Sequence, residues 1–175
     1  SLNLMRRPAD GSMPARQIRT WGKAGGPTEW SPDGRFVVYR SQDGPTGSNL
    51  WAVPSDGTGE PVRMTEPGVD ADDGQFSPDG RWFAFTGNAT GRSEVYVQRI
   101  EGIKFVGGPV RVSEGGGEGP SWRRDGTELF FLNRSALMAA EFPGGSDRPA
   151  AVPRALFTIG TLGTGPLNYR RRFSP

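Results

Sequence analysis

The stretch WSPDGRFVVYR (residues 30–40) is followed 46 positions later by FSPDGRWFAFT (residues 76–86). A third version, WRRDGTELFFL, begins another 46 positions on, at Trp122. Self-similarity at a period of about 40 to 50 residues is typical of propellers and solenoids, in which each copy is one supersecondary unit. The sequence therefore predicts an array of related units.

Each unit is expected to contain four short strands. The Ser-Pro-Asp-Gly segment places Pro and Asp at the centre of a type I turn and Gly where the backbone needs a positive φ, which predicts a hairpin. The run after each turn is apolar on both faces, as in a strand buried on both sides. A third strand follows at residues 50–53, 95–98 and 137–140. The fourth carries Pro at its start, which suits an outer edge strand.

The turns supply a set of structural residues, in which a short Asp side chain caps nearby backbone N–H groups. This role is favoured over a catalytic one for the three turn aspartates, because successive units would hold them far apart. The predicted turn residues are Ser31, Pro32, Asp33, Gly34, Ser77, Pro78, Asp79, Gly80, Asp125 and Gly126.

A four-stranded sheet with two apolar faces must lie between two sheets like itself, and radial repetition of such sheets is the β-propeller. We predict an all-β propeller with about three full blades and partial blades at both ends, cut from a larger propeller. The expected boundaries are 1–26 for the third and outer strands of a preceding blade, 27–67, 68–114 and 115–160 for three blades, and 161–175 for the start of the next. Trp30, Trp51, Trp82 and Trp122 are expected to pack between blades. An open arc would expose apolar faces, so the chain alone is expected to self-associate.

Composition excludes several classes of chemistry. The chain has no Cys and no His, so it holds no disulfide, no thiolate or imidazole zinc site and no Ser-His-Asp or Cys-His pair. The 21 basic and 19 acidic residues leave a net charge of only +2, which does not indicate a nucleic-acid-binding surface. No apolar run is long enough to span a membrane. We expect no catalytic residues, no metal and no cofactor.

Two loops between units are the candidate ligand sites. GVDADDG (residues 68–74) carries Asp70, Asp72 and Asp73, and EGGGEG (residues 114–119) carries Glu114 and Glu118. Alternating carboxylates suit calcium, but the EF-hand spacing lacks its bidentate Glu at the twelfth position. No Gly-Lys-Ser/Thr follows the glycines, which disfavours a phosphate cradle.

The copies WSPDGRFVVYRS, SNLWAVPSDG and PVRMTE together resemble the TolB-type, WD40-like (PD40) propeller repeat, and the resemblance covers nearly the whole chain. The third copy departs from it, with Arg123 and Arg124 in place of Ser-Pro and Met138 where Trp51 and Tyr96 stand. Residues 115–142 are similar to the C-terminal propellers of bacterial receptor-type serine/threonine kinases.

The resemblance implies a non-catalytic binding or sensing propeller, periplasmic or extracellular, that contacts a protein or small ligand on its inter-blade loops or central channel. The kinase likeness implies the extracytoplasmic sensor region of such a kinase. An alternative is the gating propeller of a prolyl-oligopeptidase-like peptidase with its catalytic domain elsewhere. A third reading, a propeller glycosidase, would need two carboxylates about 5 to 10 Å apart in the channel, and its candidates are Glu29, Asp73 and Glu118.

Overall fold

The structure is a computed structural model that describes residues 2–21, 25–44, 47–66, 68–142 and 152–158. All the regular secondary structure of these residues is β-strand, which confirms the all-β prediction. The strands are β1 (Leu2–Arg6), β2 (Arg16–Trp21), β3 (Gly25–Trp30), β4 (Phe36–Gly44), β5 (Gly47–Pro54), β6 (Val62–Arg63), β7 (Ala71–Phe76), β8 (Trp82–Gly87), β9 (Glu94–Glu101), β10 (Lys104–Arg111), β11 (Glu118–Trp122), β12 (Glu128–Asn133), β13 (Ala136–Glu141) and β14 (Arg154–Thr158).

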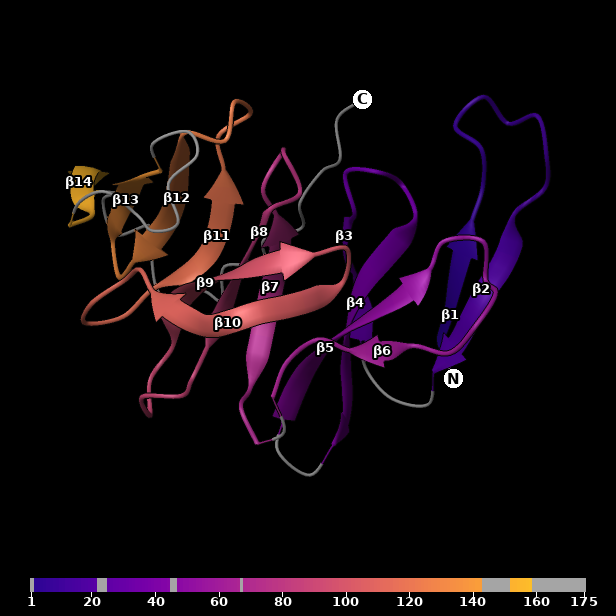
Figure 1. The fold of residues 1–175 in the computed structure, drawn as a ribbon, viewed down its shortest axis with the longest axis horizontal. Helices are drawn as coiled ribbons and strands as arrows, with labels where there is room; N and C mark the ends of the chain where they lie inside the picture. The colour runs from indigo at the N-terminus through magenta and orange to yellow at the C-terminus, as the bar shows by residue number, and fades with distance from the viewer. Residues whose placement is uncertain (1, 22–24, 45–46, 67, 143–151, 159–175) are drawn as a thin grey trace.

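The strands form four antiparallel sheets whose strand order follows the chain. Sheet I is β1–β2, sheet II is β3–β6, sheet III is β7–β10 and sheet IV is β11–β14. Figure 1 shows the sheets side by side in chain order, from indigo at one side to orange at the other. The first strands of sheets II, III and IV are neighbours, because β7 contacts both β3 and β11. This is the arrangement of consecutive propeller blades, as predicted.

Apolar side chains fill the space between each pair of sheets. Neighbouring residues of β8 point in opposite directions, so that Phe83 and Phe85 pack toward sheet II while Trp82 and Ala84 pack toward sheet IV. Every residue of β8 is buried. The second strand of a central blade therefore has no polar face, which explains its continuous apolar run in the sequence.

The Asp-Gly turn between β3 and β4 is closed by its own side chains. The Ser31 hydroxyl donates to Asp33 Oδ1 (2.6 Å) and accepts from the Phe36 N–H (2.9 Å), while Asp33 Oδ1 also accepts from the Arg35 N–H (3.0 Å). Gly34 has a φ of +70° and donates to the Ser31 carbonyl (2.8 Å). The Ser31 hydroxyl and then the Arg35 N–H hold the pKa of Asp33 below its usual value.

The same hydrogen bonds recur in the next sheet and change donor in the third. Ser77 donates to Asp79 Oδ1 at 2.6 Å, as in the first turn. In sheet IV the serine position is occupied by Arg123, and the Thr127 hydroxyl donates to Asp125 Oδ1 instead (2.6 Å). The bond from Thr127 also lowers the pKa of Asp125. The turn thus keeps a hydroxyl donor for its aspartate although the serine is lost.

The prediction of Pro at the start of the fourth strand agrees with sheets II and IV, where Pro61 and Pro153 directly precede β6 and β14, and is wrong for sheet III. β10 begins at Lys104, five residues before Pro109, which lies where the register shifts between Val106 and Val110. Proline has no N–H to donate. It is tolerated at this position because the ladder of hydrogen bonds is interrupted at the register shift.

Trp30 does not pack between blades. Its side chain is 42% exposed, whereas Phe76 at the equivalent position is 5% exposed. The described part of sheet I has only two strands, so no inner strand of that sheet lies beside β3. The Arg6 guanidinium covers the Trp30 ring instead, 5.6 Å from its centroid. The blade start expected at 161–175 lies outside the described residues.

Candidate functional site

The predicted ligand loops gather at one end of the sheets. Because the strands alternate in direction, the connections between sheets and those between second and third strands lie at the same end, which we call the loop end. The Asp-Gly turns lie at the opposite end, the turn end. All five predicted acidic residues belong to the loop end, whereas Asp33, Asp79 and Asp125 lie at the turn end, one in each four-stranded sheet.

Asp72 joins two sheets at the loop end. Its Oδ2 lies 2.7 Å from Nη1 of Arg40 on β4, and the two side chains are 35% and 36% exposed. Its Oδ1 accepts from the N–H of Asp73 (2.9 Å). The carboxylate is therefore fixed in position by one cross-sheet ion pair and one local hydrogen bond.

Asp73 has a backbone conformation that is uncommon for a residue with a side chain. Its φ is +53°, within a register shift between β7 and β8. The Thr86 hydroxyl donates to its Oδ2 (3.5 Å) and accepts from the N–H of Gly119 on β11 (3.2 Å). These two hydrogen bonds link sheet III to sheet IV next to Glu118, which is exposed and directly precedes Gly119 on β11. Asp72, Asp73 and Glu118 thus share the loop end of neighbouring inner strands.

Asp70 has a different role from Asp72 and Asp73. Its N–H donates to Asn88 Oδ1 (3.0 Å), and Asn88 Nδ2 donates to its Oδ2 (2.9 Å). Its Oδ1 is buried and has no hydrogen-bond partner among the described residues. This oxygen lies so close to Gly47 that a Cβ there would approach within 2.1 Å. Asp70 therefore braces the β8–β9 connection through its N–H and its Oδ2.

The second predicted loop is held by a residue that sequence reasoning missed. Glu94 is 2% exposed; its Oε1 accepts from the Gly116 N–H (3.1 Å) and its Oε2 from the Ser113 hydroxyl. Glu114 is exposed on this loop, and its carbonyl accepts from Asn133 Nδ2 (3.3 Å). The repeat could have indicated this role, because Glu94 aligns with Asn49 on β5, whose side chain accepts a hydrogen bond from Arg63.

The acidic residues of the loop end are spread over several strands and connections. Within the described ranges, no three Asp, Glu, His or Cys side chains come together so as to hold a metal ion. Glu29, Asp73 and Glu118 stand on three different inner strands, β3, β7 and β11. The described chain contains no helix long and apolar enough to cross a membrane.

Comparison with known proteins identifies the fold. No family model and no curated protein sequence matches this chain. Among solved structures, a TolB-type protein from Agrobacterium tumefaciens superposes with a TM-score of 0.63 and 21% identity, over 82% of this chain and 52% of the other. TolB from Acinetobacter baumannii gives the same TM-score and identity, over 82% of this chain and 36% of its own. The fold is a β-propeller of the TolB kind.

A third similar structure belongs to an enzyme. A puromycin-hydrolysing peptidase from Mycobacterium tuberculosis has a TM-score of 0.54 and 22% identity, over 74% of this chain and 22% of the peptidase. At such identities the likeness concerns architecture alone. This chain spans about half the length of the Agrobacterium protein and less of the other two.

Proposed function

We propose that this chain is a non-catalytic binding or sensing propeller whose loop end contacts a protein partner. One observation carries the proposal: Asp72, Asp73 and Glu118 lie at the loop end of adjacent inner strands, where the Arg40–Asp72 ion pair and the bonds of Thr86 cross from sheet to sheet. Polar groups held on rigid elements suit recognition with little loss of entropy.

The proposal extends to the setting of the domain. The TolB-like architecture supports an interaction role, and the resemblance of residues 115–142 to kinase propellers supports the extracytoplasmic sensor region of a bacterial serine/threonine kinase. We place the domain in the periplasm or outside the cell on the same resemblance. The same binding role would also be met if the inter-blade loops bound a small ligand instead of a protein.

Site-specific photo-crosslinking tests the loop end against the turn end. A photoreactive residue is introduced at Glu118 on β11 or, as a matched control, at Glu101 at the turn end of β9; both side chains are exposed. In the native host, the position at Glu118 should capture one specific protein, and Asp73→Asn should weaken that capture. Capture only from Glu101, or equal capture from both, would contradict the proposal.

A gating propeller of a peptidase is the second candidate, and the Mycobacterium tuberculosis structure is the observation that favours it. The flanking coding sequence separates the two. A downstream hydrolase domain with a G-x-S-x-G nucleophile elbow would support gating. An upstream kinase domain and membrane span would support the sensor role.

A further inference from the structure

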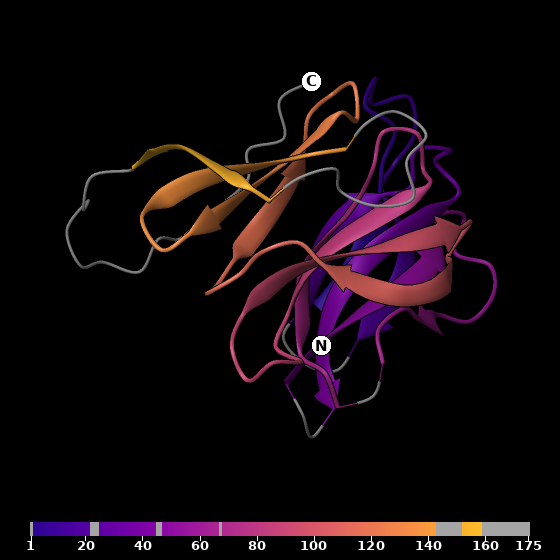
Figure 2. The same ribbon diagram turned by 60° about the vertical axis from the view of Figure 1, so that its left-hand side comes forward.

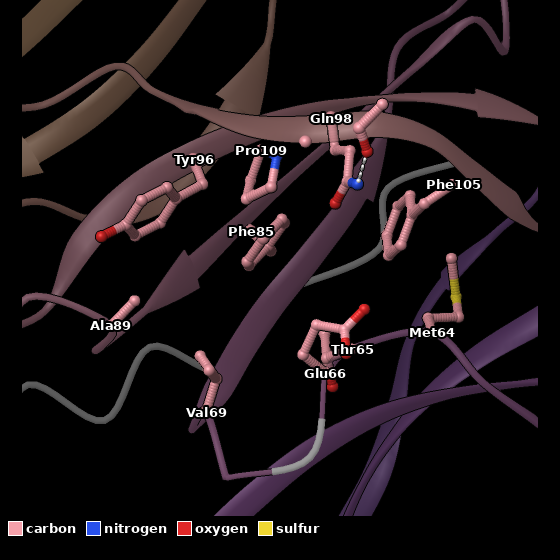
Figure 3. Close-up of a pocket in the computed structure, with 12 residues that line it drawn as sticks. Met64, Thr65, Glu66, Val69, Phe85, Ala89, Tyr96, Gln98, Phe105 and Pro109 are labelled. Carbon is pink, nitrogen blue, oxygen red and sulfur yellow. Dashed lines mark hydrogen bonds between the residues drawn. The ribbon is translucent and has the colours of Figure 1, made fainter.

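A pocket of about 190 Å³ lies between sheets II and III, and Glu66 and Val69 from the connection between these sheets, at the loop end, are part of its lining. Figure 3 shows its walls, which include Phe85, Tyr96 and Phe105 from sheet III and Met64 and Glu66 from the end of sheet II. Most of the lining is apolar, and Phe85 and Tyr96 stack with their centroids 5.7 Å apart.

The pocket exists because the outer strands of neighbouring sheets differ in length. β6 has two residues, so it leaves the outer half of the sheet III face without a matching strand. β10 has eight residues, and its Val110 and Arg111 align with Val62 and Arg63 of β6, so the additional length of β10 is its first six residues. The short β6 thus leaves space at the interface between sheets II and III.

Gln98 is the unusual residue of this pocket. The third strands align as SNLWAV, SEVYVQ and SALMAA, so that Gln98 stands where the other sheets carry Val53 and Ala140. The Gln98 side chain is only 9% exposed, and its Nε2 donates to the Gly107 carbonyl (2.6 Å). This bond fixes which amide atom is oxygen. The oxygen points into the pocket (Figure 3), and no described residue donates to it.

The second polar group is also an acceptor. Glu66 is exposed at the rim, and no ion pair joins it to any residue in the described ranges. An amide oxygen accepts hydrogen bonds, a carboxylate attracts positive charge, and aromatic faces attract cations through their quadrupole. A neutral apolar ligand would leave both acceptors unmatched.

We propose that this pocket binds an organic cation, a guanidinium or ammonium group on an apolar stem. The cationic group donates to Gln98 Oε1 and pairs with Glu66, while the stem packs on Phe85 and Phe105. Either a free small amine or the side chain of Arg or Lys on a partner has this chemistry. The pocket is lined by other residues than Asp72, Asp73 and Glu118, and the proposal stands whether or not those three contact a partner.

Titration with defined probes tests the site, with the side-chain amide signal of Gln98 followed by NMR. The probes are agmatine, the blocked peptide acetyl-Leu-Arg-Leu-amide and its uncharged norleucine counterpart. Agmatine or the arginine peptide should shift the signal, and the norleucine peptide should not. Tighter binding of the peptide assigns the ligand to a partner's side chain, whereas binding of agmatine alone assigns it to a free amine. Failure of both cationic probes, or equal binding of the norleucine peptide, would overturn the proposal.

Three variants separate recognition from folding. Gln98→Val restores the residue type of the equivalent position and should weaken binding about tenfold, with unchanged or higher resistance to urea. Glu66→Gln should weaken binding about threefold, because its charge is partly screened by solvent. Glu101→Gln removes an exposed charge at the other end of the same sheet and should change nothing. If Glu66→Gln and Glu101→Gln weakened binding equally, the effect of Glu66 would be only that of the protein's overall charge. That result would overturn the proposed ion pair between Glu66 and the ligand.

Discussion

At the scale of single residues, the repeated turn requires a residue that adopts a positive φ and a side chain that accepts a backbone hydrogen bond. Gly34 has a φ of +70°, and nothing lies within 4 Å of the place a Cβ would take. Any cost of a side chain there comes from the backbone rather than from crowding. Asp33 satisfies the N–H of Arg35, which the turn would otherwise leave without an acceptor inside the protein.

Replacement of Gly34 by Val should therefore destabilise the protein by about 1 to 3 kcal/mol, since a β-branched residue is strained at positive φ. Urea unfolding measures the change. Gly26→Val is the matched control, because Gly26 lies on β3 without a positive φ and also has open space at its Cβ position. Equal unfolding midpoints for the two variants would contradict the strain argument.

Asp33 should also make stability depend on pH. Its pKa in the folded protein is lowered, chiefly by the Ser31 hydroxyl and then by the Arg35 N–H. As pH falls through the unfolded value of about 3.9, the unfolded chain takes up the proton first, so the stabilisation present above that pH is lost. Urea midpoints between pH 6 and 3 should decline less for Asp33→Asn than for the wild type. A steeper decline in the variant would show the opposite sign.

At the scale of elements, the connections between sheets are fixed by side chains that begin strands. Glu94 starts β9 and binds the loop that leads to β11 through the Gly116 N–H and the Ser113 hydroxyl. Ser113 in turn accepts from the N–H of Val95 (2.8 Å). One buried carboxylate thus orders the path from sheet III to sheet IV.

Glu94→Leu should cost about 2 to 4 kcal/mol, because it leaves the Gly116 N–H and the Ser113 hydroxyl without their acceptor. Glu94→Gln keeps an acceptor oxygen and should cost less. Hydrogen exchange of the Gly116 amide should accelerate most in the leucine variant. Glu114→Gln is the control, since that side chain is exposed on the same loop; a similar effect there would argue against the anchoring role of Glu94.

At the scale of the whole molecule, the row of sheets leaves large aromatic side chains in water. Phe157 on β14 is 57% exposed and Trp30 on β3 is 42% exposed. We expect the 175-residue chain to self-associate through such surfaces. Light scattering should report a mass above the 18.9 kDa of one chain, and Phe157→Ser should lower it. A compact monomer for the unmodified chain would contradict this expectation.

The architecture was predictable because it is encoded locally and repeated. The period of the turns and the apolar runs such as residues 82–85 suffice for a propeller. The grouping at the loop end was not predictable, since Arg40 lies 32 residues from Asp72 and Asn88 lies 18 from Asp70. Similar aspartates in one short loop received different partners, and no pattern in the sequence distinguishes them. The pocket also escaped prediction, because it depends on the length of β6.

The third turn shows how such a repeat can change without losing its chemistry. Asp125, Gly126 and Thr127 make the same bonds as Asp56, Gly57 and Thr58 at another turn of the molecule, where the Thr58 hydroxyl donates to Asp56 Oδ1 (2.7 Å). A hydroxyl two residues after the aspartate thus substitutes for one two residues before it. A sequence that carries both hydroxyls would be an intermediate between a turn with Ser before the aspartate and a turn with Thr after it. Repeats related in this way would look unrelated to a letter-by-letter alignment, yet a search for the shared donor and acceptor would find them.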